Sequence, residues 1–174
     1  MPMNLSSTDF ELFGLEPRFE LDPDALDVCW RALQSEVHPD RFAAGAATEQ
    51  RLAMQWAVRV NEAYRRLKDP VRRGAYLCEL NGAPIEAEKN TAMPALFLTQ
   101  QMQWREALDQ AAAVSHIEAL AAEVSANRQA ALTQLRFTLD GLRDFAAAAQ
   151  QVRSLMFTER FSQAIDQRLE VLEQ

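Results

Sequence analysis

The chain has 174 residues, of which 48% are hydrophobic and 25% charged, and its formal net charge is −7. This composition is typical of a globular protein with one domain or two small ones, and the acidic balance argues against a general nucleic-acid binder. Only five glycines and seven prolines are present, so few turns are expected and a small number of long helices is favoured.

The N-terminal residues predict a short helical turn. Residues 10–15 carry Phe10, Phe13 and Leu15 toward a core, and Gly14 closes the turn. No basic segment followed by an apolar run precedes them, which argues against a secretory signal. No stretch approaches the ~20 apolar residues of a membrane span. We therefore expect a cytoplasmic protein that does not enter a membrane.

Two long helical patterns follow, at about residues 23–37 and 48–68. The first opens with Asp22 and Pro23, an N-cap residue and a proline at the first helical position. Apolar residues recur at helical spacing in both patterns. They are Leu26, Trp30, Leu33 and Val37 in the first pattern, and Leu52, Trp56, Val60, Ala63, Tyr64 and Leu67 in the second.

The stretch between these patterns contains His38, Pro39 and Asp40. Proline has no backbone N–H and a fixed φ, and it moves the preceding residue away from helical geometry. The first helix should therefore end at about Val37, and residues 38–47 should form a loop between two antiparallel helices. His38 and Asp40 would then lie at the exposed rim of this hairpin.

A fourth helix is expected from the second Asp-Pro pair, Asp69 and Pro70, to about Asn81, with Gly82 as its C-terminal stop. The helical period is lost over residues 83–93, which we interpret as a linker. Three more helices are expected at about 95–112, 115–137 and from 140 to the end, the second opening with a capping box at residues 115–118.

The last three helices can close a three-helix bundle. Its inward rows are predicted as Phe97, Trp104 and Leu108, then Ile117, Leu120, Val124, Ala131 and Leu135, then Leu142, Phe145, Ala149, Val152 and Met156. In the last helix, Phe157, Phe161, Ile165 and Leu169 drift to another side.

No catalytic or metal-binding set emerges. The sequence has no Gly-rich phosphate loop, no GxSxG and no HExxH. His38 and His116 are the only histidines, and neither has cysteine or carboxylate partners at metal spacing. Cys29 and Cys78 form neither a CxxC pair nor a disulfide framework, so two buried free thiols are expected. We expect no enzyme activity, no metal and no cofactor.

The loop and its surroundings resemble a known family. A His-Pro-Asp loop between two long antiparallel helices is similar to the signature of J-domains, which activate DnaK-type chaperone ATPases. Further segments narrow the resemblance to the HscB family, the J-type co-chaperones of iron–sulfur cluster assembly. These segments are Leu12-Phe13-Gly14-Leu15, Asn61-Glu62-Ala63-Tyr64 with Leu67, Asp69-Pro70, and residues 73–82.

The resemblance implies an all-α fold in two parts. An N-terminal J-domain over residues 1–82 would be an antiparallel helical hairpin with short flanking helices, and residues 83–93 would link it to a C-terminal three-helix bundle over 94–174. It also implies that His38, Pro39, Asp40 and Arg41 bind the chaperone. J-domains also dock through basic residues of their second helix, whereas residues 23–37 here carry Asp24, Asp27 and Glu36 against Arg31 alone.

A denser positive run occurs elsewhere, and two interpretations of it remain open. It is either a docking surface or a solvated face. Its members are Arg59, Arg65, Arg66, Lys68, Arg72 and Arg73.

The helix expected from Ala95 carries a second apolar row at i, i+4, i+8, formed by Leu98 and Met102 and continued by Glu106. This row is either core of a longer bundle or an exposed binding surface. The resemblance implies that Leu98, Met102, Glu106 and Phe157 hold the iron–sulfur scaffold protein, IscU.

The expected function is therefore a co-chaperone that stimulates a specialised DnaK-type ATPase, HscA, and delivers the scaffold to it, so that clusters are transferred to iron–sulfur proteins. One alternative keeps the J-domain and gives the bundle another client. The other is an all-helical adaptor in which the His-Pro-Asp sequence is accidental.

Overall fold

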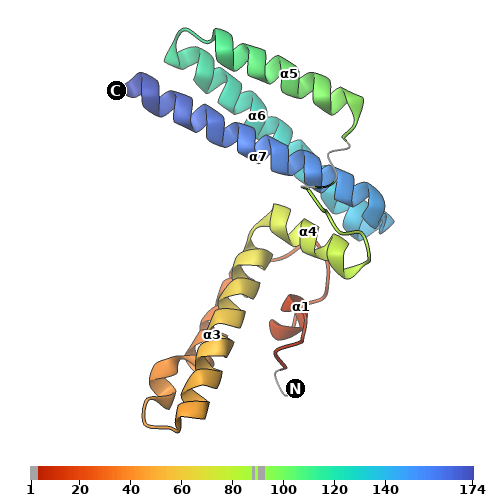
Figure 1. Cartoon of the computed structure of the whole chain (residues 1–174). Helices are drawn as coiled ribbons and strands as arrows, with labels where there is room; N and C mark the ends of the chain where they lie inside the picture. The colour runs from red at the N-terminus through yellow and green to blue at the C-terminus, as the bar shows by residue number, and fades with distance from the viewer. Residues whose placement is uncertain (1–3, 88, 90–92) are drawn as a thin grey trace. The chain divides into compact units, whose positions relative to one another are not determined.

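The computed structural model describes residues 4–87, 89 and 93–174, and these residues form helices joined by turns and loops (Figure 1). The chain divides between Tyr76 and Leu77 into two compact units. Within the described residues, no helix combines the length and the apolar character that crossing a membrane requires. The all-helical fold expected from the sequence is confirmed.

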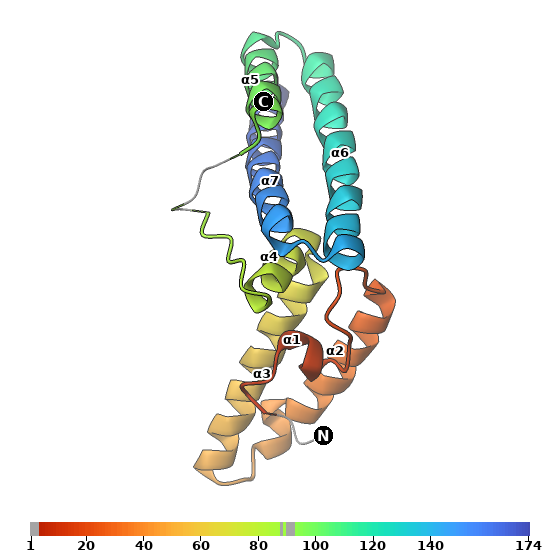
Figure 2. The same cartoon turned by 90° about the vertical axis from the view of Figure 1, so that its right-hand side faces the viewer.

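The first unit is built on a helical hairpin. Its elements are α1 (Asp9–Leu12), α2 (Pro23–Val37), a 3₁₀ turn η1 (Pro39–Phe42), α3 (Ala47–Lys68) and the beginning of α4 (Pro70–Leu80), which runs past the unit boundary. Helices α2 and α3 lie side by side and run in opposite directions (Figure 2). The bounds agree with the helices predicted at 23–37 and 48–68 to within one residue.

The helix ends use the residues that the sequence singles out. The Asp22 carboxylate accepts from the backbone N–H of Asp24 at 3.0 Å, and the Asp69 carboxylate accepts from that of Val71 at 2.9 Å. Gly82 ends α4 with φ +78°, a left-handed conformation that glycine adopts without a Cβ penalty. The predicted N-caps and stop are therefore confirmed.

The core of the first unit lies between α1, α2, α3 and the start of α4. Leu52, predicted on the inward face of α3, is 49% exposed, whereas the neighbouring Ala53 is buried. The fully or almost fully buried side chains include Phe10, Phe13, Phe19, Leu26, Val37, Ala53, Val60, Ala63, Leu67 and Val71.

A polar and aromatic seam holds α2 against α3. The rings of Trp30 and Tyr64 stack with their centroids 4.6 Å apart. The Asn61 side-chain oxygen accepts from the Trp30 indole N–H at 3.1 Å and also from the amide of Gln34. These contacts fix the register of the two helices and hence the position of the loop that joins them.

Asp27 closes this seam at its other end. Its carboxylate accepts from the Lys68 ammonium at 2.7 Å and from the Tyr64 hydroxyl at 2.8 Å. The bond from Lys68, followed by that from Tyr64, holds the pKa of Asp27 below its ordinary value, and the same contact raises the pKa of Lys68. Both ionised forms are therefore favoured in the folded state.

A buried carboxylate anchors α1. Asp9 has no exposed surface, and its oxygens lie 2.7 Å from the Arg59 guanidinium and 3.4 Å from that of Arg66. The Asp9 backbone N–H donates to the Tyr76 hydroxyl at 3.0 Å, and Arg66 lies over the Tyr76 ring. Arg59 also donates to the Ser7 carbonyl at 2.8 Å. Asp9 thus ties the N-terminal segment to α3 through its carboxylate and to α4 through its backbone N–H.

The second unit contains a three-helix bundle. Its helices are α5 (Ala95–Gln110), α6 (Val114–Arg136) and α7 (Phe145–Glu173), with a π-helical turn η2 (Phe137–Leu142) between the last two. Trp104 of α5 stacks on Phe161 of α7 with centroids 5.7 Å apart, and its indole N–H donates to Glu123 of α6 at 2.9 Å. One side chain therefore joins all three helices.

Two local predictions for the bundle were wrong. Helix α6 begins at Val114 after Ala113 without a side-chain cap, so Ser115 lies inside the first turn and the expected capping box does not form. The last helix begins at Phe145 rather than near Asp140, because Arg143 adopts the left-handed conformation and Asp144 caps the helix. Leu142 falls in this reversal and is 60% exposed instead of buried.

The inward row of α7 also changes along its length. Phe161 and Ile165 belong to the core with Trp104, Ile117 and Val124, although the sequence placed them on a drifting face. Helix α7 has 29 residues. Because an α-helix has 3.6 residues per turn, residues spaced four apart do not stay on one side of a helix of this length. The buried side of α7 therefore changes where α5 packs against it.

The segment expected as a linker, residues 83–93, includes residues 88 and 90–92, which lie outside the described residues. Within its described part, Ile85 is buried, and its carbonyl accepts from the Arg153 guanidinium of α7 at 3.0 Å. Arg153 itself is only 6% exposed. At least this point of the segment is therefore fixed to the second unit.

Replacing Asp9 by Asn should destabilise the first unit by about 3 kcal/mol, because Arg59 and Arg66 would be left partly buried without a charged partner. Denaturant unfolding followed by tryptophan fluorescence measures this change. The control is Asp24→Asn, an exposed carboxylate in α2, whose cost should stay at about 0.5 kcal/mol or less. Equal stability of the two variants would show that backbone carbonyls alone satisfy the arginines.

The Asp27 contacts predict a pH dependence. Because the Lys68 and Tyr64 contacts hold the folded-state pKa of Asp27 below the ordinary value of an aspartate, its stabilisation is fully present above that ordinary value and is lost as the pH falls through the folded-state pKa. The free energy of unfolding of the wild type should therefore exceed that of Asp27→Asn at pH 7 and approach it in strong acid. Unfolding curves from pH 2 to 7 test this, and a difference independent of pH would contradict it.

Candidate functional site

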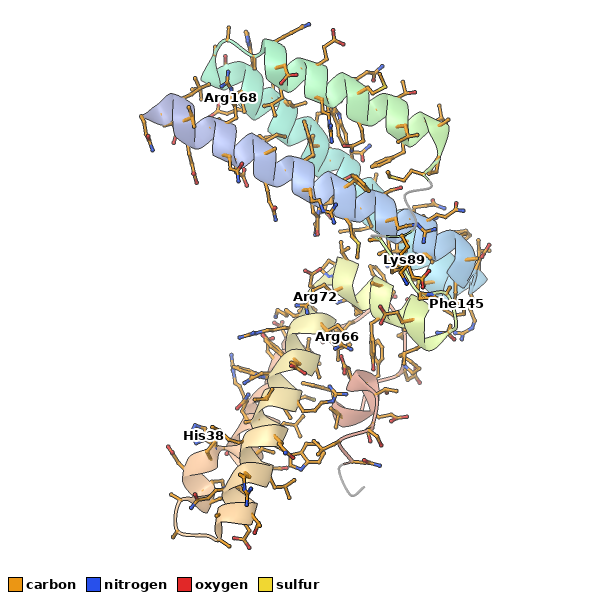
Figure 3. All side chains as sticks on the ribbon, viewed as in Figure 1. His38, Arg66, Arg72, Lys89, Phe145 and Arg168 are labelled. Atoms are coloured by element: carbon orange, nitrogen blue, oxygen red, sulfur yellow. The ribbon has the colours of Figure 1, made fainter. Side chains whose placement is uncertain are left out.

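The stretch His38-Pro39-Asp40 lies at the end of the hairpin. Helix α2 ends at Val37, His38 leaves the helix with φ −59° and ψ 130°, and Pro39 opens the 3₁₀ turn η1. The sequence predicted a loop here, and the structure adds this turn. The side chains of His38 and Asp40 are 54% and 91% exposed, and Figure 3 shows His38 projecting from the hairpin.

The conformation of this turn sets the tautomer of His38. Its Nδ1 accepts from the backbone N–H of Asp40 at 3.2 Å, so in the neutral ring the proton is carried by Nε2. The Asp40 carboxylate lies 3.5 Å from the same Nδ1. The turn thus presents an outward N–H donor and an exposed carboxylate on either side of a rigid residue.

Two further side chains brace the loop. Arg41 donates to the carbonyl of Ser35 at 3.2 Å, which satisfies an acceptor in the last turn of α2. Gln50 of α3 donates to the carbonyls of Ala43 and Gly45, both at 3.1 Å. The loop is therefore held from both helices. The role of Gln50 was missed in the sequence, because no local pattern marks a side chain that braces a preceding loop.

The positive run along α3 and α4 is largely used within the fold. Arg59 and Arg66 pair with Asp9, Lys68 pairs with Asp27, and Arg73 donates to the Phe19 carbonyl. The interpretation of the positive run as a solvated face is therefore wrong for these four residues, because they hold α1, α2 and the segment before α2 in place. The side chains of Arg65 and Arg72 remain exposed.

The α5 face predicted to bind a partner is exposed. Leu98 and Met102 are 46% and 72% exposed, and Glu106 is also exposed and accepts from Gln110 at 3.1 Å. This exposure excludes the core alternative for Leu98 and Met102. Phe157 of α7 is half-buried. A binding role for these four residues remains a prediction.

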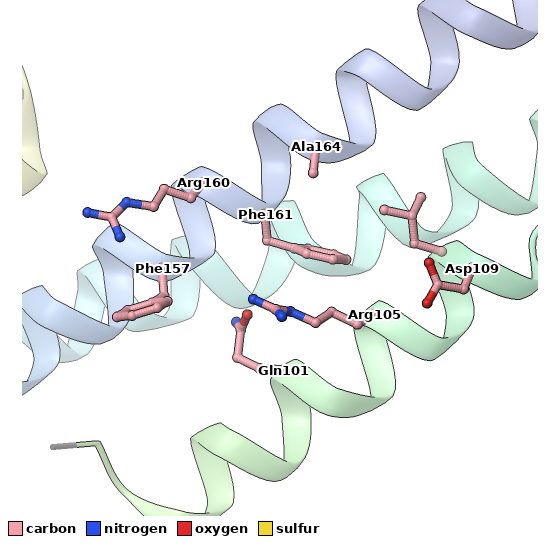
Figure 4. Close-up of a pocket in the computed structure, with 8 residues that line it drawn as sticks. Gln101, Arg105, Asp109, Phe157, Arg160, Phe161 and Ala164 are labelled. Atoms are coloured by element: carbon pink, nitrogen blue, oxygen red, sulfur yellow. The ribbon is translucent and has the colours of Figure 1, made fainter. Parts of the chain in front are cut away.

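Phe157 belongs to a groove between α5 and α7. The cavity has a volume of about 440 Å³, and Figure 4 shows side chains from both helices around it. Its walls combine two phenyl rings with arginines, an amide and a carboxylate, and it is lined by Gln101, Arg105, Leu108, Asp109, Phe157, Arg160, Phe161 and Ala164. The sequence did not predict this groove, because no local period relates residues of α5 to residues of α7.

Among the described residues, no group of three or more His, Cys, Asp or Glu side chains could hold a metal ion. Cys78 is fully buried, and burial raises the pKa of its thiol to about 11, although the nearby Arg153 acts in the opposite direction. A buried thiol at such a pKa is not a nucleophile at neutral pH.

Comparisons with known sequences show which family the chain resembles. A family model described as the HSCB C-terminal oligomerisation domain matches residues 93–166. The chain is 48% identical over 174 residues to the co-chaperone protein HscB homolog of Burkholderia multivorans, covering 98% of this chain and 99% of that protein. A protein of the same name from Bordetella petrii is 49% identical over 157 residues, covering 90% and 92% of the two chains.

Solved structures give the same result. The chaperone HscB from Vibrio cholerae is 35% identical with a TM-score of 0.83, covering 95% of this chain and 99% of that one. Human co-chaperone protein HscB superposes with a TM-score of 0.89 at 24% identity, covering 94% and 83% of the two chains, and supports the fold alone.

Proposed function

The chain belongs to the HscB family of co-chaperones, and from this premise we propose that it stimulates the ATPase of the specialised DnaK-type chaperone HscA and delivers the iron–sulfur scaffold protein IscU to it. Co-chaperones of this family are not enzymes, and membership of the family implies an Hsp70-type partner. The observation that carries the proposal is the exposed, braced His38-Pro39-Asp40 turn in a chain 48% identical to HscB homologs over nearly its whole length.

The proposed action of the turn is binding, and the hydrolytic residues belong to the chaperone. A ligand shifts a conformational equilibrium only by binding one state more tightly than the other. The His38 Nε2–H and the Asp40 carboxylate can supply that difference on the ATP-bound chaperone. Because Pro39, Arg41 and Gln50 already hold the turn, little conformational entropy is lost when it docks.

The second proposed surface is the face formed by Leu98, Met102, Glu106 and Phe157, which would hold the scaffold. Exposed apolar side chains that lie together on one helix face are typical of an interaction site. On this proposal the J-domain spans residues 1–82, residues 83–93 form a linker, and residues 94–174 bind the scaffold. The protein would act in the cytoplasm.

Replacing His38 by Gln should abolish stimulation of the chaperone ATPase and leave the fold intact, because His38 is exposed and surface changes cost little stability. Steady-state ATP hydrolysis by HscA with increasing co-chaperone measures the effect. His116→Gln is the matched control, since His116 is the other histidine and is also exposed. Full stimulation by His38→Gln would contradict the proposed role of the turn.

Replacing Met102 or Leu98 by Ala should weaken scaffold binding about 5- to 30-fold, which corresponds to about 1–2 kcal/mol for an apolar contact. The melting temperature should change little, because both side chains are exposed. Calorimetric titration with the scaffold and a thermal melt on the same variants measure the two effects. Leu96→Ala is the control, since Leu96 lies on the same helix and is 87% exposed but points to another side.

A lower melting temperature with unchanged affinity per folded molecule would show that these side chains only stabilise the bundle, and would contradict the proposed contact. Unchanged affinity and unchanged melting would leave the α5 face without the proposed role.

A further inference from the structure

The groove between α5 and α7 has polar groups that its own surroundings do not satisfy. Gln101 is buried, with only 8% of its surface exposed. Its side-chain Nε2 has no hydrogen-bond acceptor among the described residues. An unpaired buried amide of this kind costs free energy unless something outside the chain completes it.

Two arginines line the groove that contains this amide. Arg105 of α5 and Arg160 of α7 both line the groove, and Figure 4 shows the Arg105 guanidinium extending toward the Gln101 amide. Arg160 lies over the Phe157 ring at 5.4 Å. Neither guanidinium has a carboxylate within ion-pair distance among the described residues, whereas Arg59, Arg66 and Arg128 each have one.

The one carboxylate that lines the groove, Asp109, does not pair with these arginines among the described residues. Asp109 lies one turn beyond Arg105 on α5, and Figure 4 shows it at the opposite end of the groove from Gln101. No ion pair joins it to Arg105 within the described part of the chain. The Gln101 amide and the Arg105 guanidinium therefore lie close together in the groove with no carboxylate beside them among the residues that line it there, in a protein whose net charge is −7.

The chemistry that fits is a carboxylate. A guanidinium and an amide N–H can both donate to its two oxygens, and the broad terminal torsion of glutamine lets Nε2 turn toward the groove. Phe157 and Phe161 line the same groove and can cover the apolar stem of an acidic side chain. Such a contact is favourable where a partner already excludes water from the site.

We infer that this groove is a carboxylate subsite that receives an Asp or Glu side chain of the protein docked on the neighbouring α5 face. Phe157 joins the two surfaces, because it lines the groove and belongs to the proposed scaffold-binding face. Apolar contacts on one side of Phe157 and an ion pair on the other would fix the orientation of the scaffold on the bundle. The inference rests on the proposed function, since it takes the scaffold as the docked protein.

Three variants test the subsite by calorimetric titration of the full chain with the iron–sulfur scaffold protein. Arg105→Gln should weaken binding about 5- to 20-fold, as expected for a close charge pair at an interface. Arg160→Gln should weaken it less, because Arg160 also contacts Phe157. Arg168→Gln is the matched control. It makes the same charge change on an exposed residue of α7 about two turns beyond Arg160, and should change affinity less than 2-fold.

Gln101→Glu separates a binding role from a structural one. The new carboxylate would pair with Arg105 inside the groove and occupy the subsite. Scaffold affinity should fall at least 10-fold while the melting temperature stays equal or rises. A lower melting temperature together with unchanged affinity would assign Gln101 to packing and overturn the inference.

Two further measurements test whether Arg105 pairs with a carboxylate of the scaffold: the salt dependence of binding and substitutions in the scaffold. Affinity of the wild type should fall more steeply between 50 and 300 mM salt than that of Arg105→Gln, because exposed charge pairs are screened. Among single Asp→Asn and Glu→Gln changes in the scaffold, one should weaken binding to the wild type about 5- to 20-fold and binding to Arg105→Gln less than 2-fold. Failure to find such a carboxylate overturns the inference.

The outcomes distinguish the two proposals. If Met102→Ala weakens scaffold binding but Arg105→Gln and Gln101→Glu do not, the subsite is wrong and the proposed function stands. If Arg105→Gln and Arg168→Gln weaken binding equally, the effect is general charge attraction and the subsite is again wrong. If the wild type does not bind the scaffold, the proposed function fails, and the inference fails with it.

Discussion

The first unit depends on the backbone restriction that Pro39 imposes. A residue without an N–H and with φ fixed near −65° ends α2 and directs the chain into a tight turn. Once α2 has ended, the chain can return as α3, and the seam of Trp30, Asn61 and Tyr64 sets how the two helices meet. The exposed side chains on both sides of the proline are thus held by the same restriction that makes the hairpin.

Charged residues divide into those that hold the fold and those that remain free for a partner. Asp9 and Asp27 hold cations from the second half of α3, so that Asp9 ties α1 to this helix and Asp27 ties α2 to it. Most of the dense positive run is used in this way, which leaves little of it for docking. The arginines that line the groove between α5 and α7 contrast with these, because neither has a carboxylate partner among the described residues, and Arg105 extends toward a buried amide that lacks one hydrogen-bond partner.

Much of the fold could be predicted from the sequence, because its signals are local. Aspartate before proline marked the starts of α2 and α4, and helical spacing gave α3, α5 and α6 to within two residues. The errors lie where tertiary contacts decide. Ser115 was a plausible cap, yet α6 begins before it, and the left-handed Arg143 that delays α7 has no glycine or asparagine signature. The partners of the cations, Asp9 above all, are far from them in sequence.

The position of Phe157 links these surfaces to the packing of the bundle. It stands one turn before Phe161, whose ring stacks on Trp104, and Trp104 is bonded to Glu123. The distance between α5 and α7, and hence the width of the groove, is therefore set by a core contact. Apolar residues of α5 and rings of α7 form one surface only while that contact holds. A partner that touches both helices binds the folded bundle and has little affinity for either helix alone, so its binding also stabilises the packing on which the surface depends.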